Sequence, residues 1–385
     1  MDPARIVEAA AALSKAPVPD GASFMEGLEV LSAGVNASPI ISEAGRRSIE
    51  RQATGHLANR LAVEAYLSSH PQLLEGQVEQ PVFVLGMPRT GTTLMVNLLN
   101  QDTAARTLRK WEVNYPVPPA RAGELSTDPR CLEQNAKRRR EVAEGKLQTN
   151  IHFEWYEEPT ECVYVLMQDF KSTAWDALQP MPAYSEFLLA ADLEPTYRWH
   201  RRLLQHLQEN NPGRWTLKAP GHALFARDLL EVYPDARLVW MHRDPRTVVA
   251  SHASLAEGAH KRFAERADIA YIAEFYPRQL AEHVNRMLDV EADHPGQVFH
   301  VHYEDAVERP VEAVEKLYAD MGLALDTATR AAVEGWVAEH RRESRGEHKY
   351  SLEQFGIDPA RVHRLFARYA ERRAAVPPVA MGEVE

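Results

Sequence analysis

A glycine-bounded turn with one cation is the first segment whose residue types could do chemistry. Residues 86–93 read GMPRTGTT, after the apolar run 82–85 and before a helical pattern. Glycines at both ends let the backbone turn tightly and point its N–H groups inward, and a helix N-terminus adds positive potential, so this loop could hold an anion. Thr92 and Thr93 could cap the helix and donate hydroxyls to a phosphate. The planar fork of Arg89 could hold an oxyanion bidentately.

The loop lacks the lysine of a Walker A motif. Thr92 stands where the pattern Gly-x-x-x-x-Gly-Lys-[Ser/Thr] requires Lys. A nucleoside triphosphatase uses that Lys on the β- and γ-phosphates together with a bound metal. The pattern therefore favours an anion held without metal. A P-loop kinase or nucleoside triphosphatase is the alternative enzyme class, and a non-catalytic nucleotide-binding module is a second alternative.

A second basic segment follows another apolar run. Residues 242–251 read HRDPRTVVAS after the run 237–241. This places Arg243 at the end of a predicted strand and Ser251 about two helical turns later, with Pro245 suited to the first turn. Two strand ends with cations in one sheet indicate a ligand that carries two separated anionic groups.

Short apolar runs alternate with helical patterns from residue 81 onward. The runs lie at 82–85, 214–217, 237–241 and 298–301, and the helical patterns that follow them at 94–99, 224–232, 248–255 and 311–321. Strand, turn and helix repeated in this order predict an α/β fold, a P-loop-like parallel sheet flanked by helices. Ligands of such sheets bind beyond the carboxyl ends of the strands.

The other segments are mainly helical by pattern. We expect residues 1–80 to form an N-terminal helical cap, and residues 81–385 an α/β domain with helical insertions at about 113–213 and 257–296. Aromatic residues gather between Phe153 and Trp199, which suits either an acceptor pocket or a packed helical subdomain. The insertions are predicted to form a cap on the acceptor side.

Composition describes an acidic chain of ordinary globular character. Its 385 residues carry 44 Lys and Arg against 55 Asp and Glu, a formal net charge of −11, which argues against nucleic acid as a partner. Two cysteines are too few for a disulfide framework or a Cys-rich zinc site, and no metal is expected. The chain shows no signal-peptide pattern and no apolar run near the roughly 20 residues that span a bilayer. We expect a cytoplasmic protein without a transmembrane segment, with a homodimer as the default oligomer.

The motifs resemble those of the sulfotransferase superfamily, which transfers a sulfuryl group from 3′-phosphoadenosine 5′-phosphosulfate (PAPS) and releases 3′-phosphoadenosine 5′-phosphate (PAP). Residues 86–93 are similar to its 5′-phosphosulfate loop, and residues 243–251 resemble its 3′-phosphate motif with the Arg–Ser spacing matched. The Tyr-Glu-Asp sequence at 303–305 resembles a strand-to-helix turn common in that fold. The resemblance covers about residues 80–325. It is nearest to the bacterial and tyrosylprotein-type branch, because Lys-Ala-Pro at 218–220 precedes the 3′ motif.

The resemblance implies a role for each matched residue. The residues implied to hold the 5′-phosphosulfate are Arg89, Thr90, Gly91, Thr92 and Thr93. Those implied to hold the 3′-phosphate are Arg243 and Ser251. Residues 345–350 match the family's C-terminal phosphate loop only in part, and they add two further candidates, Arg345 and Lys349.

Sulfuryl transfer requires fixed cations at the leaving phosphate and a base near the acceptor proton. Arg89 and Lys218 are predicted to stabilise the leaving oxygen. Two residues compete for the base: Glu112, placed approximately where the tyrosylprotein branch has its catalytic Glu, and His222, whose imidazole titrates near neutral pH. We favour Glu112. The expected acceptor is a hydroxyl or amine of a small molecule, lipid or carbohydrate, and the fold does not choose among them.

Overall fold

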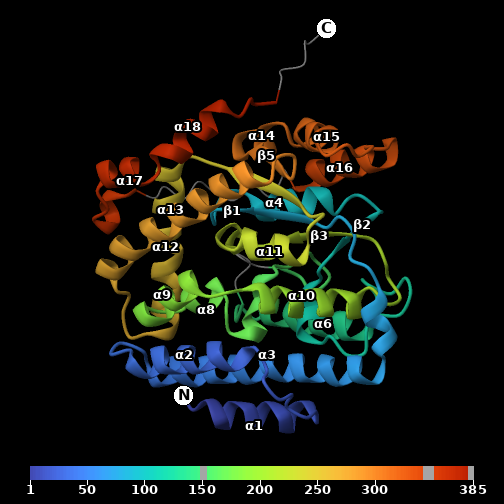
Figure 1. The fold of residues 1–385 in the computed structure, drawn as a ribbon, viewed down its shortest axis with the longest axis vertical. Helices are drawn as coiled ribbons and strands as arrows, with labels where there is room; N and C mark the ends of the chain where they lie inside the picture. Colours follow the sequence, from blue (N-terminus) through green and yellow to red (C-terminus); the bar gives the residue numbers. More distant parts are fainter. Residues whose placement is uncertain (148–153, 341–350, 380–385) are drawn as a thin grey trace. The chain divides into compact units, whose positions relative to one another are not determined.

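The computed structural model describes residues 1–147, 154–340 and 351–379, and the chain divides into two compact units (Figure 1). The first unit comprises Met1–Glu79, Arg106–Asp176 and Met181–Trp215 within those described ranges. The second comprises Gln80–Ala105, Ala177–Pro180 and the described residues from Thr216 onward. Apart from Ala177–Pro180, the described residues of the insertion predicted at about 113–213 therefore group with residues 1–79.

The first unit consists mainly of helices. Along the chain these are α1 (Pro3–Ser14), α2 (Phe24–Ala37), α3 (Glu43–Ser69), η1 (Pro71–Glu75), α5 (Lys110–Asn114), α6 (Pro129–Ala143), α7 (Val163–Leu166), η2 (Met167–Asp169), α8 (Thr173–Asp176), α9 (Pro182–Ala190) and α10 (Glu194–Leu207). Helix α1 packs along the long helix α3 (Figure 1). Ser42 caps α3 by accepting a hydrogen bond from the N–H of Gly45 (2.9 Å), as expected for a serine at this position.

A buried ion pair ties three helices of the first unit together. Arg60 on α3 pairs with Asp169 of η2, and both side chains are almost fully excluded from solvent. The Asp169 carboxylate also accepts from the hydroxyls of Ser23 (2.6 Å) and Thr196. The Arg60 guanidinium carbon lies 4.7 Å from the ring centroid of Trp199. These partners satisfy charges that would otherwise be costly to bury.

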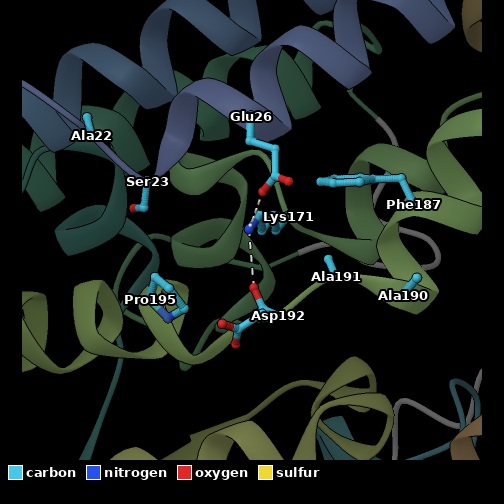
Figure 2. A pocket seen from close by; sticks show the side chains of 9 residues that line it. All are labelled: Ala22, Ser23, Glu26, Lys171, Phe187, Ala190, Ala191, Asp192 and Pro195. Carbon is cyan, nitrogen blue, oxygen red and sulfur yellow. Dashed lines mark hydrogen bonds and ion pairs between the residues drawn. The ribbon is translucent and has the colours of Figure 1, made fainter.

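The first unit also contains a cavity of about 460 Å³ (Figure 2). Nine residues line it: Ala22, Ser23, Glu26, Lys171, Phe187, Ala190, Ala191, Asp192 and Pro195. Lys171 is only 4% exposed, and its ammonium contacts the Glu26 carboxylate (2.8 Å) and the main-chain carbonyl of Asp192 (3.2 Å). None of the nine lining residues belongs to the predicted sulfuryl-transfer site.

Five strands form one sheet, in the order β2-β3-β1-β4-β5. In chain order they are β1 (Val82–Gly86), β2 (Ala105–Thr107), β3 (Arg214–Lys218), β4 (Arg237–His242) and β5 (Val298–His302). The neighbours β3-β1, β1-β4 and β4-β5 pair in parallel. All four predicted strands are confirmed, each longer by one residue at its carboxyl end, whereas β2 was not predicted.

The strand register decides where the predicted motifs meet. In the parallel pairs, Val84 lies opposite Lys218, and Gly86 lies opposite Met241. The strands β3, β1 and β4 therefore end at the same edge of the sheet, with β1 between the other two. The loop that follows β1 therefore leaves the sheet between the ends of β3 and β4. In parallel sheets, ligands bind in a crevice at the carboxyl ends of the strands, so a crevice is expected at this edge.

Helices cover the sheet of the second unit. Along the chain they are α4 (Thr92–Leu99), η3 (Pro220–Leu224), α11 (Ala226–Val232), α12 (Pro245–Phe263), α13 (Ile269–Asp293), α14 (Tyr303–Glu308), α15 (Pro310–Asp320), α16 (Thr327–His340), η5 (Glu353–Phe355), α17 (Pro359–Leu365) and α18 (Ala367–Ala375). Leu98 of α4 and Leu317 of α15 share one buried core with Val84 and Val239 of the sheet. Helices α14 and α15 pack against β5, and α16 packs against α15 and α4 (Figure 1).

Over the described ranges, no helix combines the length and the apolar character that crossing a membrane would require.

Four histidines, three of them buried and one half-buried, should make the protein sensitive to acid. Burial lowers the pKa of His56, His260 and His283 from 6.5 to about 4, and that of His200 to about 3. Below pH 6.5 the unfolded chain therefore binds more protons than the folded protein. Stability that is fully present above that pH should be lost as the pH falls, at about 1.4 kcal/mol per pH unit for each histidine.

Urea unfolding at several pH values between 7 and about 4.5 measures this slope. The variant His283→Gln removes one of the four groups, so its free energy of unfolding should fall less steeply with pH than that of the wild type. Identical slopes for the two proteins would contradict the assignment of His283 as a neutral buried imidazole.

Candidate active site

The loop after β1 requires glycine at both of its ends. Gly86 has φ 141°, and a Cβ there would lie 2.8 Å from the main-chain oxygen of Met241. Gly91 has φ 87°, and a Cβ there would lie 2.8 Å from the ring of Tyr303. Between them, Arg89 has φ 69°, which a residue with a side chain rarely adopts. The backbone is therefore held in a strained turn, as is common where a loop surrounds a ligand.

Helix α4 starts directly after this turn, with Gly91 as its N-cap and no capping side chain. The expectation that Thr92 and Thr93 cap the helix is wrong, because both residues lie inside its first turn. Thr90 is fully buried and donates its hydroxyl to the carbonyl of Met87 (2.7 Å), which closes the loop. The first-turn N–H groups of α4 are thus not capped by the threonines, and an anion could accept from them.

Lys218 lies beside the loop, as its position at the end of β3 predicts. The residue is 1% exposed, and its ammonium donates to the hydroxyl of Thr93 (3.2 Å). Thr93 itself is exposed on the first turn of α4. The structure therefore brings together a buried cation and an accessible hydroxyl that are 125 residues apart in the chain.

The two predicted anion motifs are joined by side-chain contacts. Arg89 donates through Nε to the hydroxyl of Ser251 (3.2 Å). Arg243 donates through one guanidinium nitrogen to the main-chain carbonyl of Arg89 (2.7 Å). Arg89, Arg243 and Ser251 thus form one connected group at the ends of β1 and β4.

Tyr303 belongs to this group, although no role in the site was predicted for it. The Arg243 guanidinium carbon lies 3.8 Å from the centroid of the Tyr303 ring, which is a cation–π contact. The same ring closes over Gly91. Tyr303 follows β5 directly, so the reasoning that selected Arg243, a strand end in a parallel sheet, would also have selected Tyr303.

His222 lies in the same compact unit as the loop. It sits in the 3₁₀ turn η3, is fully buried, and packs edge-on against Phe83 of β1 at a ring-centroid distance of 5.1 Å. Phe83 is three residues before Gly86, where the loop begins. The predicted base His222 is thus packed on the strand that leads into the glycine-bounded loop.

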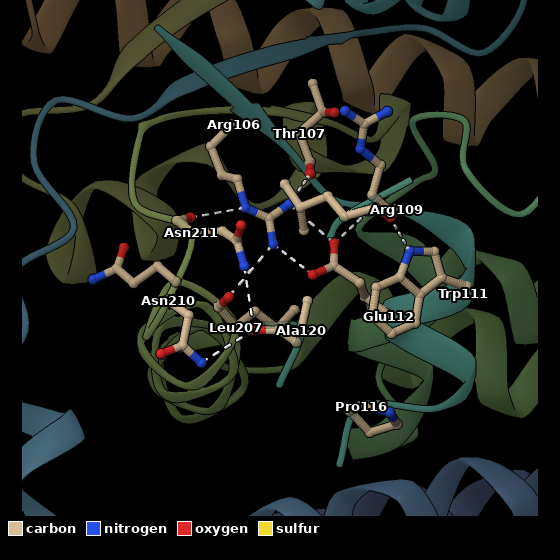
Figure 3. A network of polar contacts seen from close by, with 12 residues as sticks. Arg106, Thr107, Arg109, Trp111, Glu112, Pro116, Ala120, Leu207, Asn210 and Asn211 are labelled. Atoms are coloured by element: carbon tan, nitrogen blue, oxygen red, sulfur yellow. Dashed lines mark hydrogen bonds and ion pairs between the residues drawn. The ribbon is translucent and has the colours of Figure 1, made fainter. Parts of the chain in front are cut away.

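Glu112 lies in the first unit, in the short helix α5, and has no solvent exposure (Figure 3). Its carboxylate accepts hydrogen bonds from both terminal nitrogens of Arg106, one of them at 2.9 Å, and from the main-chain N–H of Arg109 at 3.2 Å. The other predicted base is therefore part of a bidentate buried ion pair.

Arg106 is completely hydrogen-bonded (Figure 3). Besides Glu112, it donates to the main-chain carbonyls of Thr107 (2.5 Å), Leu207 (3.5 Å) and Asn211 (3.2 Å). Its guanidinium carbon also lies 4.6 Å from the ring centroid of Trp215. These contacts use all five N–H groups of the guanidinium, so the ion pair is a fixed feature of the first unit.

The two candidates from the C-terminal motif, Arg345 and Lys349, lie outside the described residues. Within the described ranges, no three His, Cys, Asp or Glu side chains come together as metal ligands could.

Comparison with known proteins identifies the family. A sequence model of the sulfotransferase family matches residues 81–327, which include both anion motifs and the strand ends that carry them. The chain belongs to the sulfotransferase family. It is therefore an enzyme that moves a sulfuryl group to an acceptor, and the kinase, triphosphatase and non-catalytic alternatives are set aside.

Mycobacterial proteins are similar to this sulfotransferase over most of its length. The crystal structure of sulfotransferase STF9 from Mycobacterium avium is 33% identical, covers 98% of each chain and superposes with a TM-score of 0.91. Sulfotransferase STF1 from Mycobacterium tuberculosis is 27% identical over 96% of this chain and 99% of its own, with a TM-score of 0.86. The omega-hydroxy-beta-dihydromenaquinone-9 sulfotransferase Stf3 of Mycobacterium bovis is 24% identical over 78% of this chain and 77% of its own.

Removing only one charge of the Arg106–Glu112 pair should destabilise the sulfotransferase. Glu112→Gln leaves the buried guanidinium without its carboxylate, and we expect the free energy of unfolding to fall by about 3–5 kcal/mol. The double variant Arg106→Met/Glu112→Leu removes both charges and should recover part of that loss, because the three main-chain carbonyls that Arg106 binds then lose their donor. Denaturant unfolding followed by circular dichroism measures both, and a Glu112→Gln protein as stable as the wild type would contradict the structural role of the pair.

Proposed function

We propose that this sulfotransferase moves the sulfuryl group of PAPS to a hydroxyl on a lipid or another small molecule. The observation that carries the proposal is the connected group of Arg89, Arg243 and Ser251, with Lys218 on Thr93 beside it. A donor with a phosphosulfate at one end and a phosphate at the other requires two such anion subsites at a fixed separation.

The residues of the second unit fit this donor. Gly86 and Gly91 leave a turn that a Cβ would obstruct, and the first turn of α4 offers main-chain N–H groups to the 5′-phosphosulfate. We assign the 5′ subsite to Arg89, Thr90, Gly91, Thr92 and Thr93, and the 3′-phosphate subsite to Arg243 and Ser251. Thr90 contributes through its main chain, because its hydroxyl is bound to Met87.

Charge stabilisation is the main task of the cations. In the reaction, the acceptor oxygen bonds to sulfur while the bond from sulfur to the bridging phosphate oxygen breaks, and negative charge develops on the phosphate that leaves. Lys218 and Arg89, held in place by Thr93 and Ser251, are the side chains that we assign to that charge. Because both are fixed before the reaction, little reorganisation is needed when the charge appears.

Glu112 and His222 are both kept as candidates for the base that takes the acceptor proton. His222 shares a unit with the phosphosulfate loop and packs on Phe83. Glu112 would have to accept a proton while Arg106 holds both of its carboxylate oxygens. The two surroundings differ so much that variants of each can be told apart.

A lipid hydroxyl is the acceptor class that we favour. The support is the similarity to the Mycobacterium bovis enzyme, whose name specifies an omega-hydroxylated dihydromenaquinone. The aromatic-rich insertion that the sequence marked as a possible acceptor pocket is compatible with an apolar substrate. A cytoplasmic location and a homodimer stay predictions from the sequence.

Arg89→Ala should weaken nucleotide binding. The loss of a charge-assisted contact to the 5′ group should raise the dissociation constant for PAP by about 10- to 100-fold, as measured by isothermal titration calorimetry. Arg330→Ala is the matched control, because Arg330 is an arginine on α16 whose ion-pair partners, Glu315 and Glu334, are not residues of the predicted site. Unchanged affinity in Arg89→Ala would disprove the assignment of the loop.

Incubation with radiolabelled PAPS and a lipid extract of the host should yield a labelled lipid, identified by mass spectrometry as a sulfate ester. The extract should stop accepting label when its free hydroxyl groups are acetylated. Label that appears only in water-soluble products would rule out the lipid acceptor.

The same assay separates the two candidate bases. Loss of the general base should lower kcat by about 100- to 10,000-fold while the affinity for PAP is retained. His222→Gln is compared with Arg106→Met/Glu112→Leu, in which the buried charges are removed together. A stable but inactive double variant beside an active His222→Gln protein identifies Glu112, and an inactive His222→Gln protein beside an active double variant identifies His222. If both variants keep full turnover, neither residue is the base.

A further inference from the structure

Tyr369 of helix α18 holds the backbone of Arg243. The Tyr369 side chain is fully buried, and its hydroxyl accepts a hydrogen bond from the main-chain N–H of Arg243 (3.2 Å). The same hydroxyl lies 3.4 Å from the main-chain carbonyl of Arg243. The contact joins residues 126 positions apart, and α18 lies beyond the part of the chain that the sulfotransferase sequence model matches.

Two histidines, His242 and His300, form a row of polar contacts that ends at the Tyr369 hydroxyl. His242 Nδ1 lies 3.3 Å from the Tyr369 hydroxyl, and His242 Nε2 lies 2.9 Å from His300 Nδ1. His300 Nε2 in turn contacts Glu291 (2.9 Å) and Arg372 (2.8 Å). His242 of β4 and His300 of β5 thus connect the Tyr369 hydroxyl to an ion pair. That pair consists of Glu291 on α13 and Arg372 on α18.

The row is consistent in either hydrogen-bond direction. If Arg372 donates to His300, each imidazole donates toward Tyr369, and the Tyr369 hydroxyl donates to the carbonyl of Arg243. If His300 donates from Nε2 to Glu291 instead, the two imidazole bonds reverse and the hydroxyl donates to His242, while Arg372, which can only donate, keeps its bond to Glu291. In both cases the hydroxyl still accepts from the N–H of Arg243.

Both imidazoles are neutral near pH 7, as the row requires. Burial lowers the pKa of His242 well below 6.5, and the neighbouring His300 lowers it further. Burial also lowers the pKa of His300, against the opposing effect of Glu291. Other charged or titratable groups that act on the pair are Arg372, Arg373 and His302.

The geometry points to Tyr369 as a positioning residue of the 3′-phosphate site, acting on the nucleotide through the backbone of Arg243. This inference rests on the proposed function, because it takes Arg243 as the 3′-phosphate ligand. The Arg243 side chain is fixed at its tip by the Arg89 carbonyl and the Tyr303 ring, and its main chain is fixed by Tyr369. With both ends held, the guanidinium presents its remaining N–H groups in one orientation.

Tyr369→Phe removes the hydroxyl and keeps the ring, so it tests the positioning role directly. We expect the dissociation constant for PAP to rise about fivefold, the effect of one lost neutral hydrogen bond, while that for adenosine 5′-phosphate, which lacks the 3′-phosphate, is unchanged. The KM for PAPS should rise by the same factor with kcat unchanged, because the substrate and the transition state lose the same binding free energy at the 3′ end. His300→Gln, which disturbs the row without touching Arg243, should give a smaller loss confined to PAP.

Tyr318→Phe is the matched control. Tyr318 is also buried in the second unit, and its hydroxyl donates to Asp102 (2.8 Å) rather than to a residue of the site. It should lower the melting temperature without changing the ratio of the two nucleotide affinities. Affinity for PAP equal to that of the wild type in Tyr369→Phe, or an equal loss for both nucleotides, would overturn the positioning role. A wild-type protein that fails to bind PAP would overturn the proposed function and this inference with it.

Discussion

The hydrogen bond from the Arg243 guanidinium to the main-chain carbonyl of Arg89 joins the two halves of the site. It can form because β1 and β4 pair in parallel with Gly86 opposite Met241, so the loops that follow the two strands leave the sheet at the same edge. A guanidinium has five N–H groups, and one bond to a carbonyl leaves the others for a phosphate. The spacing of the two proposed anion subsites is therefore set by the sheet register and kept by this bond before any ligand arrives.

The charge of the whole chain gives no indication of this local arrangement. A protein with a formal net charge of −11 is an unexpected partner for a donor that carries a phosphate and a phosphosulfate. Arg89, Lys218 and Arg243 nevertheless lie in one unit at adjoining strand ends, next to the N-terminus of α4. Cations that are fixed and partly buried act more strongly on a bound anion than exposed acidic residues elsewhere, whose fields water and salt screen.

The first unit depends on charges of a different kind. Arg60–Asp169 and Arg106–Glu112 are buried pairs in which each guanidinium also lies over a tryptophan. Such pairs contribute little net stability compared with an apolar core, but they hold their surroundings in one arrangement because breaking them is costly. Glu112 therefore has a structural role whether or not it also takes a proton in the reaction. Only variants that replace Arg106 and Glu112 together can separate the structural role from the catalytic one.

The sequence by itself determined four of the five strands, the glycine loop and the positions of Arg89, Lys218 and Arg243 at or next to strand ends, because these features follow from local periodicity and from glycine spacing. It also determined the family through motifs at matched separations. Only the tertiary structure decided which side chains meet: Lys218 with Thr93 across 125 residues, Tyr369 with Arg243 across 126, and Tyr303 with both Arg243 and Gly91. It likewise decided that Glu112, read from the sequence as a candidate base, is held by Arg106 and thereby linked to the carbonyls of Leu207 and Asn211. The physical reason is that a side chain's partners depend on strand register and helix packing, and neither is encoded within any one short segment.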